Sequence, residues 1–152
     1  CGRMCIPFET IIMNFYLYLI GALLAITGGA FSFYFYAVSI GRMPYRQWWV
    51  PRICQIDLTN CVAITRTKYG QIFGITNSIS GTIFLIIYGY TLLTAAIGWV
   101  DPLLPFIMGV FTILIGLYLV YGLFKLKTVC PLCITIHTMS LVIFILQLII
   151  VY

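Results

Sequence analysis

The stretch KTVCPLCITIHTMSLVIFILQLIIVY, from Lys127 to Tyr152, joins a Cys-x-x-Cys pair to a long apolar run. From Leu132 onward the run has the length of about 20 residues that an α-helix needs to cross a bilayer. It shows no strict alternation of polar and apolar residues, so it does not predict a strand. The stretch therefore predicts a membrane-spanning helix with two thiols at its N-terminal end.

The composition of the whole chain indicates that the bilayer is its solvent. The 152 residues are 63% hydrophobic and only 7% charged, whereas soluble domains carry about a quarter charged residues. Four runs are long and apolar enough to span a membrane, and a β-barrel is disfavoured. They cover about residues 11–38, 76–100, 103–124 and 132–152. The predicted fold is an all-α integral membrane bundle of four helices, forming one domain over residues 1–152.

The connections between the runs predict which segments share a membrane face. Asp101 and Pro102 form a tight turn between the second and third helices. The long connection, residues 39–75, is rich in aromatic and basic residues and is expected to lie in the headgroup region as short interfacial helices. Because helices alternate in direction, this loop and the link before Cys130 lie at the same face. Four cysteines are therefore expected there: Cys54, Cys61, Cys130 and Cys133.

Two arguments give opposite orientations of that face. The positive-inside rule puts it in the cytoplasm, because it carries every basic residue except Arg3. Disulfide chemistry is more usual on the oxidising side. Labelling of Cys54 in intact cells with an impermeant thiol reagent distinguishes the two.

The net charge of +5 fits contacts with anionic lipid headgroups, and nothing in the sequence predicts binding to nucleic acid.

The clustered cysteines admit three interpretations. A Cys-x-x-Cys at a helix N-terminus favours a thiolate, with Cys130 near the N-cap and accessible, and Cys133 one turn deeper and facing the bundle. Pro131 suits the first helical turn. The pair would then be a redox dithiol. The alternatives are a zinc site built from four cysteines and inert buried cysteines. Six residues separate the cysteines of CQIDLTNC, more than the two to four of a usual zinc knuckle, which favours redox chemistry.

The sequence resembles the vitamin K epoxide reductase family of membrane thiol oxidoreductases. The resemblance lies in CQIDLTNCVAITRTKYGQIFGITNSISG, from Cys54 to Gly81, and CPLCITIHTMS, from Cys130 to Ser140. The shared pattern is a loop cysteine pair, a Ser or Thr six residues later, FGI, NS-x-x-G opening a helix, and Cys-x-x-Cys beginning the fourth helix. It covers about residues 11–149, without the fused thioredoxin-like domain of some bacterial members.

The resemblance implies a role for each cysteine. Cys133 would react with a quinone of the ubiquinone, menaquinone or vitamin K type, and Cys130 would exchange disulfides with Cys61. Cys54, paired with Cys61, would face a thioredoxin-like redox partner. No metal is implied. Cys1 and Cys5 match nothing in the family pattern.

Three further residues are candidates for the same site. The resemblance makes Asn77 a donor to a quinone carbonyl, while Gly74, Ser78 and Gly81 are expected to allow close helix packing. His137 shares a helix face with Cys133, so it is either a structural histidine or a functional one. A functional His137 would donate a hydrogen bond to the quinone or carry a charge that favours the Cys133 thiolate. Ionisable groups inside membranes favour the second interpretation. Thr67 matches the Ser/Thr position, and helix capping would explain it equally well.

The leading functional hypothesis is a membrane enzyme that couples thiol–disulfide exchange to quinone reduction and promotes protein disulfide formation. A reductase of vitamin K epoxide or vitamin K quinone is the alternative within the same class. At the position of His137 the vertebrate enzymes have a tyrosine, which favours a respiratory quinone. A structural membrane module that binds zinc is the alternative from another class.

Overall fold

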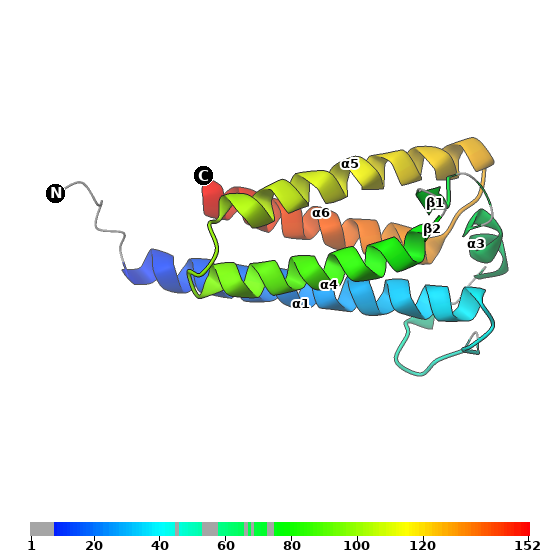
Figure 1. The fold of residues 1–152 in the computed structure, drawn as a ribbon, viewed down its shortest axis with the longest axis horizontal. Helices are drawn as coiled ribbons and strands as arrows, with labels where there is room; N and C mark the ends of the chain where they lie inside the picture. The colour runs from blue at the N-terminus through cyan, green and yellow to red at the C-terminus, as the bar shows by residue number, and fades with distance from the viewer. Residues whose placement is uncertain (1–7, 45, 53–57, 66, 68, 73–74) are drawn as a thin grey trace.

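The computed structural model describes residues 8–44, 46–52, 58–65, 67, 69–72 and 75–152. Four helices in these segments are long and apolar enough to cross a membrane, which confirms the predicted four-helix fold. They lie side by side, with a shorter helix and a hairpin of two strands at one end of the bundle (Figure 1). In chain order the elements are α1 (Phe8–Ser39), α3 (Leu58–Thr65), β1 (Gln71–Ile72), β2 (Ile75–Thr76), α4 (Asn77–Ala96), α5 (Leu103–Leu126) and α6 (Pro131–Val151).

The two ends of the bundle carry different parts of the chain. The start of α1, the turn from α4 to α5 and the end of α6 lie at one end, on the left of Figure 1. The helix α3, the strands and the link from α5 to α6 lie at the other end. Cys61 is in α3, and Cys130 and Cys133 are at the start of α6. These three cysteines therefore share one end, as the alternation of helices predicts. Cys54 lies outside the described residues.

The second membrane helix ends four residues earlier than predicted, at Ala96 rather than at residue 100. Gly98 has a φ of 76°, a left-handed conformation that terminates helices because glycine has no Cβ to clash. The Gly98 N–H donates to the Ala95 carbonyl and the Trp99 N–H to the Thr94 carbonyl. These two bonds satisfy carbonyls that would otherwise be left unpaired at the helix end.

The helix α5 ends in the same way, but without a glycine. Lys127 takes the left-handed conformation, with φ 50° and ψ 36°, and its N–H donates to the Leu123 and Phe124 carbonyls. A side chain in this conformation brings its Cβ close to the following carbonyl, which costs roughly 1–2 kcal/mol. The link that leads to the Cys-x-x-Cys pair is therefore held in an unfavourable backbone conformation.

Replacing Lys127 with glycine is expected to raise the free energy of unfolding by about 0.5–1 kcal/mol, because the steric cost disappears. The matched control is Lys125→Gly in the last turn of α5, which should lower it by roughly 0.5–1 kcal/mol. Unfolding in detergent, followed by circular dichroism, measures both. Equal destabilisation by the two variants would contradict the prediction.

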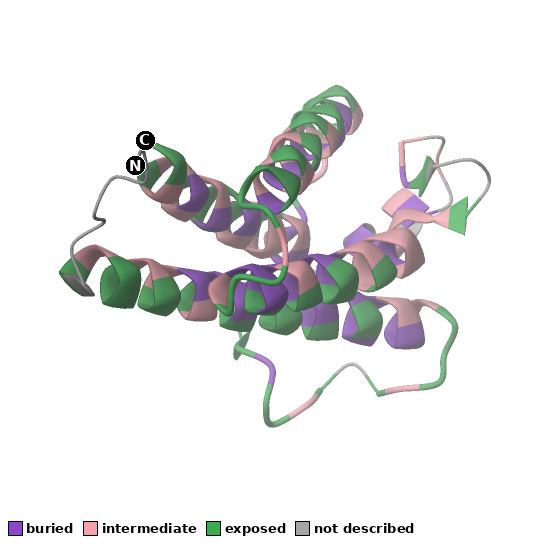
Figure 2. Cartoon of the chain, turned by 60° about the vertical axis from the view of Figure 1, so that its left-hand side comes forward, coloured by how far each residue is buried: buried purple, intermediate pink, exposed green. Residues whose placement is uncertain are grey.

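Helices α1 and α4 pack closely against each other near the cysteine end of the bundle. The Ser32 hydroxyl donates to the Ser78 carbonyl at 2.9 Å, and a Cβ built on Gly81 would lie 3.0 Å from the Ser32 Oγ. Ser78 and Gly81, two of the three small residues predicted to allow close packing, do so here. Gly74, the third, lies outside the described residues. Buried residues lie on the sides of the helices that face one another, and exposed ones face outward (Figure 2). The outward faces carry large apolar side chains such as Leu114 and Leu117, as expected next to lipid.

The loop between α1 and α4 is anchored to the bundle by an aromatic contact. The Trp49 ring stacks on Phe31, with ring centroids 6.2 Å apart, and meets Tyr34 edge-on at 5.4 Å. The neighbouring Trp48 side chain is 94% exposed. This arrangement agrees with the predicted interfacial segment, in which tryptophan rings lie at headgroup depth.

The sequence did not predict the hairpin that leads into α4. Its strands pair antiparallel, with Gln71 opposite Thr76 and Ile72 opposite Ile75. Next to it, the Asn77 N–H donates to the Gly70 carbonyl at 2.9 Å. The hairpin and this bond fix the position of the first residue of α4.

Candidate functional site

The start of α6 has the geometry that the sequence predicts. Cys130 is the N-cap, with an extended backbone at φ −118° and ψ 98°, and Pro131 follows in the first turn. The Cys130 carbonyl accepts from the Ile134 N–H at 3.1 Å. Cys133 therefore lies one turn into the helix, on the side of the bundle interior.

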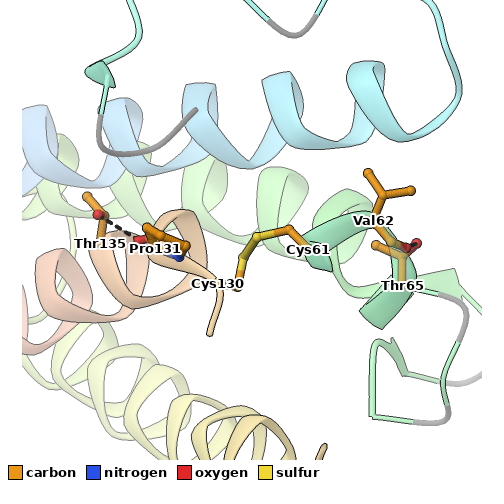
Figure 3. The surroundings of a disulfide bond; sticks show 6 residues. All are labelled: Cys61, Val62, Thr65, Cys130, Pro131 and Thr135. Atoms are coloured by element: carbon orange, nitrogen blue, oxygen red, sulfur yellow. Dashed lines mark hydrogen bonds between the residues drawn. A yellow bond between two sulfur atoms is a disulfide. The ribbon is translucent and has the colours of Figure 1, made fainter. Parts of the chain in front are cut away.

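A disulfide bond joins Cys61 of α3 to Cys130 (Figure 3). Their Cα atoms are 5.2 Å apart, within the range of ordinary disulfides. Cys61 is 1% exposed and Cys130 is 0% exposed. The expectation that Cys130 is the accessible thiol is therefore wrong, because its sulfur is bonded to Cys61 of α3 and enclosed by apolar side chains, mainly from α1. Both residues belong to an apolar cluster with Phe35 and Leu132.

Cys133 is the free thiol of the described part of the chain. It is partly exposed, and it lines a cavity. Cys54, which the family resemblance pairs with Cys61, lies outside the described residues, as do Cys1 and Cys5. In this structure the partner of Cys61 is Cys130. The arrangement is a disulfide between the loop and the Cys-x-x-Cys pair, with the second thiol of that pair left free.

The cavity lies inside the bundle and measures about 240 Å³. All four membrane helices and residues from the α3 segment contribute to its walls. Cys133, Asn77 and His137 all line it, together with Cys61. The remaining walls are mainly apolar and include Phe35, Phe84, Leu85, Phe111, Ile115 and Leu119.

The polar groups of the cavity fall into two kinds. The hydroxyls of Ser32, Thr112 and Ser140 donate to backbone carbonyls at 2.9, 2.7 and 3.1 Å. The Asn77 amide and the His137 ring make no hydrogen bond to any residue that the structure describes. An unpaired amide inside a bundle costs free energy unless something occupies the site. The Ser78 hydroxyl, which also lines the cavity, is buried without a hydrogen-bond partner among the described residues. Unpaired hydrogen-bonding groups therefore line the same apolar cavity as a free thiol.

Thr67, the third predicted residue, lies elsewhere. Its hydroxyl donates to the Ile64 carbonyl at 2.7 Å, its N–H donates to the same carbonyl at 2.9 Å, and its own carbonyl accepts from the Gly70 N–H. It does not line the cavity. These bonds close the end of α3, as the capping interpretation describes.

The comparison with protein families agrees with this geometry. The model of the vitamin K epoxide reductase family matches residues 19–148 of the 152-residue chain. The chain belongs to this family. It is a multi-pass membrane oxidoreductase of the vitamin K epoxide reductase kind. The comparisons with curated proteins and with solved structures returned no match. The matched range includes α3, the cavity and the cysteines of α6.

Three contacts of this family member could not be read from local sequence patterns. A Cβ on Gly122 of α5 would lie 2.9 Å from the Tyr69 Cβ, so the loop tyrosine packs directly on the helix backbone. The Tyr69 ring also contacts Tyr118 of α5, and Tyr69 lines the cavity. A Cβ on Gly116 would lie 3.2 Å from the His137 Nδ1. The one available signal was the recurrence of Gly109, Gly116 and Gly122 along the third apolar run.

The structure also bears on the possibility of a metal site. Within the described ranges no three His, Cys, Asp or Glu side chains come together in a way that could hold a metal ion. Cys61 and Cys130, two of the four cysteines that a zinc site would need as thiolates, are joined as a disulfide.

Proposed function

We propose that this family member takes electrons from a thioredoxin-like protein through four cysteines and passes them to a quinone, thereby promoting protein disulfide formation. The observation that carries the proposal is the cavity: a free Cys133 thiol, the unpaired Asn77 amide and the His137 ring line it, next to the Cys61–Cys130 disulfide. Its walls are apolar, as a membrane-soluble oxidant requires.

The relay consists of thiol–disulfide exchanges that balance at each step. The Cys130 and Cys133 dithiol gives two electrons and two protons to the quinone, forming their disulfide and a quinol. The Cys61 thiolate then attacks the Cys130 sulfur, which releases Cys133. The Cys54 thiolate attacks Cys61 and frees Cys130, and the partner's dithiol reduces the Cys54–Cys61 disulfide. The bond between Cys61 and Cys130 corresponds to the intermediate after the second step.

Asn77 and His137 have the chemistry to bind the quinone. An amide N–H and an imidazole N–H both donate to carbonyl oxygens, and such donors stabilise the negative charge that develops on a quinone during reduction. A cavity of about 150 Å³ accommodates benzene, so a volume of about 240 Å³ admits a quinone ring with small substituents.

The charge at the cysteine end of the bundle favours contact with anionic lipid headgroups. Several basic side chains are exposed at this end: Arg42, Arg46, Arg52, Lys125 and Lys127. Anionic headgroups attract such groups by about 1 kcal/mol each. Arg66 and Lys68, the other basic residues of the loop, lie outside the described residues. Membrane lipids are therefore among the proposed partners of this chain, which we propose forms a single domain.

The decisive experiment uses the protein in liposomes with a reduced thioredoxin-like protein as donor. Ubiquinone, menaquinone and vitamin K epoxide analogues are offered as acceptors, and quinol formation is followed by absorbance. Turnover with a quinone supports the proposal, and absence of turnover with every acceptor refutes it.

A parallel alkylation assay tests the zinc alternative, because release of the four thiols by a chelator alone, without a reductant, would favour a metal site.

Replacing Asn77 with alanine is expected to raise the KM for the quinone about tenfold, because one hydrogen bond of about 1–1.5 kcal/mol is lost. Thr82→Ala is the matched control on α4, since its hydroxyl donates to the Ser78 carbonyl and it does not line the cavity. Steady-state quinol formation measures both variants. An unchanged KM for Asn77→Ala would remove this residue from the quinone site.

A further inference from the structure

The orientation of the His137 ring follows from its contact with α5. A Cβ built on Gly116 would lie 3.2 Å from the ring Nδ1, 3.6 Å from Cγ and 3.8 Å from Cε1. The ring therefore presents its Nδ1 edge to the backbone of α5. The opposite edge, with Nε2 and Cδ2, points away from that helix.

Nothing else in the described structure holds the ring in place by a hydrogen bond. The imidazole makes none to a described residue, while His137 lines the cavity. Gly116 itself is buried in α5. Packing against the bare backbone at Gly116 is therefore what fixes the direction of the ring.

We infer that Gly116 is a positioning residue: it lets the His137 ring lie against α5 with Nδ1 inward, so that Nε2 faces the cavity and donates its proton to a quinone carbonyl. This inference rests on the proposed function and adds the nitrogen that binds and the residue that selects it. A neutral imidazole carries its proton on one nitrogen, so this geometry calls for the tautomer protonated at Nε2.

The contact tolerates no side chain without movement of the ring. The Cβ of an alanine at position 116 would be closer to Nδ1 than about nine in ten real Cβ contacts, so one of the two groups has to move by a few tenths of an ångström. The α5 backbone is held by its own hydrogen bonds, so the imidazole has to turn. Rotation moves Nε2 away from the position in which it meets the quinone.

Gly109 provides a control on the same helix. It lies two turns before Gly116, is also buried in α5, and a Cβ there would lie 2.9 Å from the Tyr88 Oη and 3.1 Å from Phe144. Neither Gly109 nor Tyr88 lines the cavity. Gly109→Ala therefore creates a steric conflict at least as severe as that of Gly116→Ala, without touching the candidate quinone site.

Because the chain contains a single histidine, ¹⁵N-histidine labelling gives a spectrum of His137 alone. We expect the reduced protein to show a proton on Nε2, and a ubiquinone analogue to shift the Nε2 resonance much more than the Nδ1 resonance. A shift confined to Nδ1, or no shift at all in a protein that reduces the analogue, would overturn the inference. This measurement on the wild-type chain does not depend on any variant folding.

Kinetics supply the second test. Gly116→Ala should raise the KM for the ubiquinone analogue about tenfold with a smaller change in kcat, and Gly109→Ala should leave KM unchanged. In a His137→Ala background, Gly116→Ala should add no further increase. Equal KM values for wild type and Gly116→Ala refute the positioning role while quinone reduction stands. Failure of the wild type to reduce any quinone refutes the proposed function instead.

Discussion

Replacing Cys133 with serine is expected to abolish quinol formation, with a loss of at least about a thousandfold. Cys133 is the free thiol that lines the cavity, and a serine hydroxyl cannot form the disulfide that carries two electrons to the quinone. Serine is close to cysteine in size, so the packing of α6 should be retained. Absorbance of the quinol, with a reduced thioredoxin-like protein as donor, measures the effect.

The control for Cys133→Ser is Cys5→Ser, because Cys5 is predicted at the opposite membrane face and outside the family pattern. This variant should turn over at the wild-type rate. Quinone reduction by Cys133→Ser at more than a few per cent of the wild-type rate would show that another group reacts with the quinone. The assignment of Cys133 would then be incorrect.

Replacing Cys61 with serine is expected to allow one turnover and no more. The reduced Cys130 and Cys133 pair can still give two electrons to one quinone, but the disulfide that they form then has no Cys61 thiolate to attack it. The donor protein cannot take over this step, because Cys130 is enclosed by apolar side chains. We expect a burst of about one quinol per enzyme, followed by a rate at least about a hundredfold below that of the wild type.

Pre-steady-state absorbance separates the two cysteine variants, since Cys133→Ser should show no burst at all. Alkylation of Cys61→Ser after the burst should find Cys130 and Cys133 both protected. Continued turnover of Cys61→Ser with the protein donor would mean that electrons reach α6 by a route that does not include α3.

The membrane helices were predictable because each apolar run is long, and the structure confirms all four. The position of Cys130 at the N-cap was predictable for a local reason, since proline suits the first turn of a helix. The end of α4 was wrong by four residues, because Trp99 and Val100 continue the apolar composition while Gly98 ends the helix. Composition does not reveal a backbone angle.

The candidate site was predictable in part. Family resemblance identified Asn77 and Cys133, and helical spacing placed His137 beside Cys133; the cavity brings the three together. Gly116 and Tyr69 were not found, because their importance comes from contacts between α5 and segments distant in sequence. A glycine in an apolar run gives no indication of which ring packs against it. The burial of Cys130 was missed for the same reason, since it depends on how α1 and α3 pack around it.

The burial of the Cys61–Cys130 bond has a consequence for the cell's redox balance. Under the proposed relay, a solvent-exposed junction between loop and membrane helix would let any dissolved thiol pass electrons directly to the quinone. With both sulfurs of the Cys61–Cys130 bond removed from water, such leakage is slow whatever the reduction potentials are. Under the proposed relay the enzyme selects its reductant by whether that reductant can reach the buried disulfide. Reducing thiols in water and an oxidising quinone in the membrane can then coexist without coming to equilibrium.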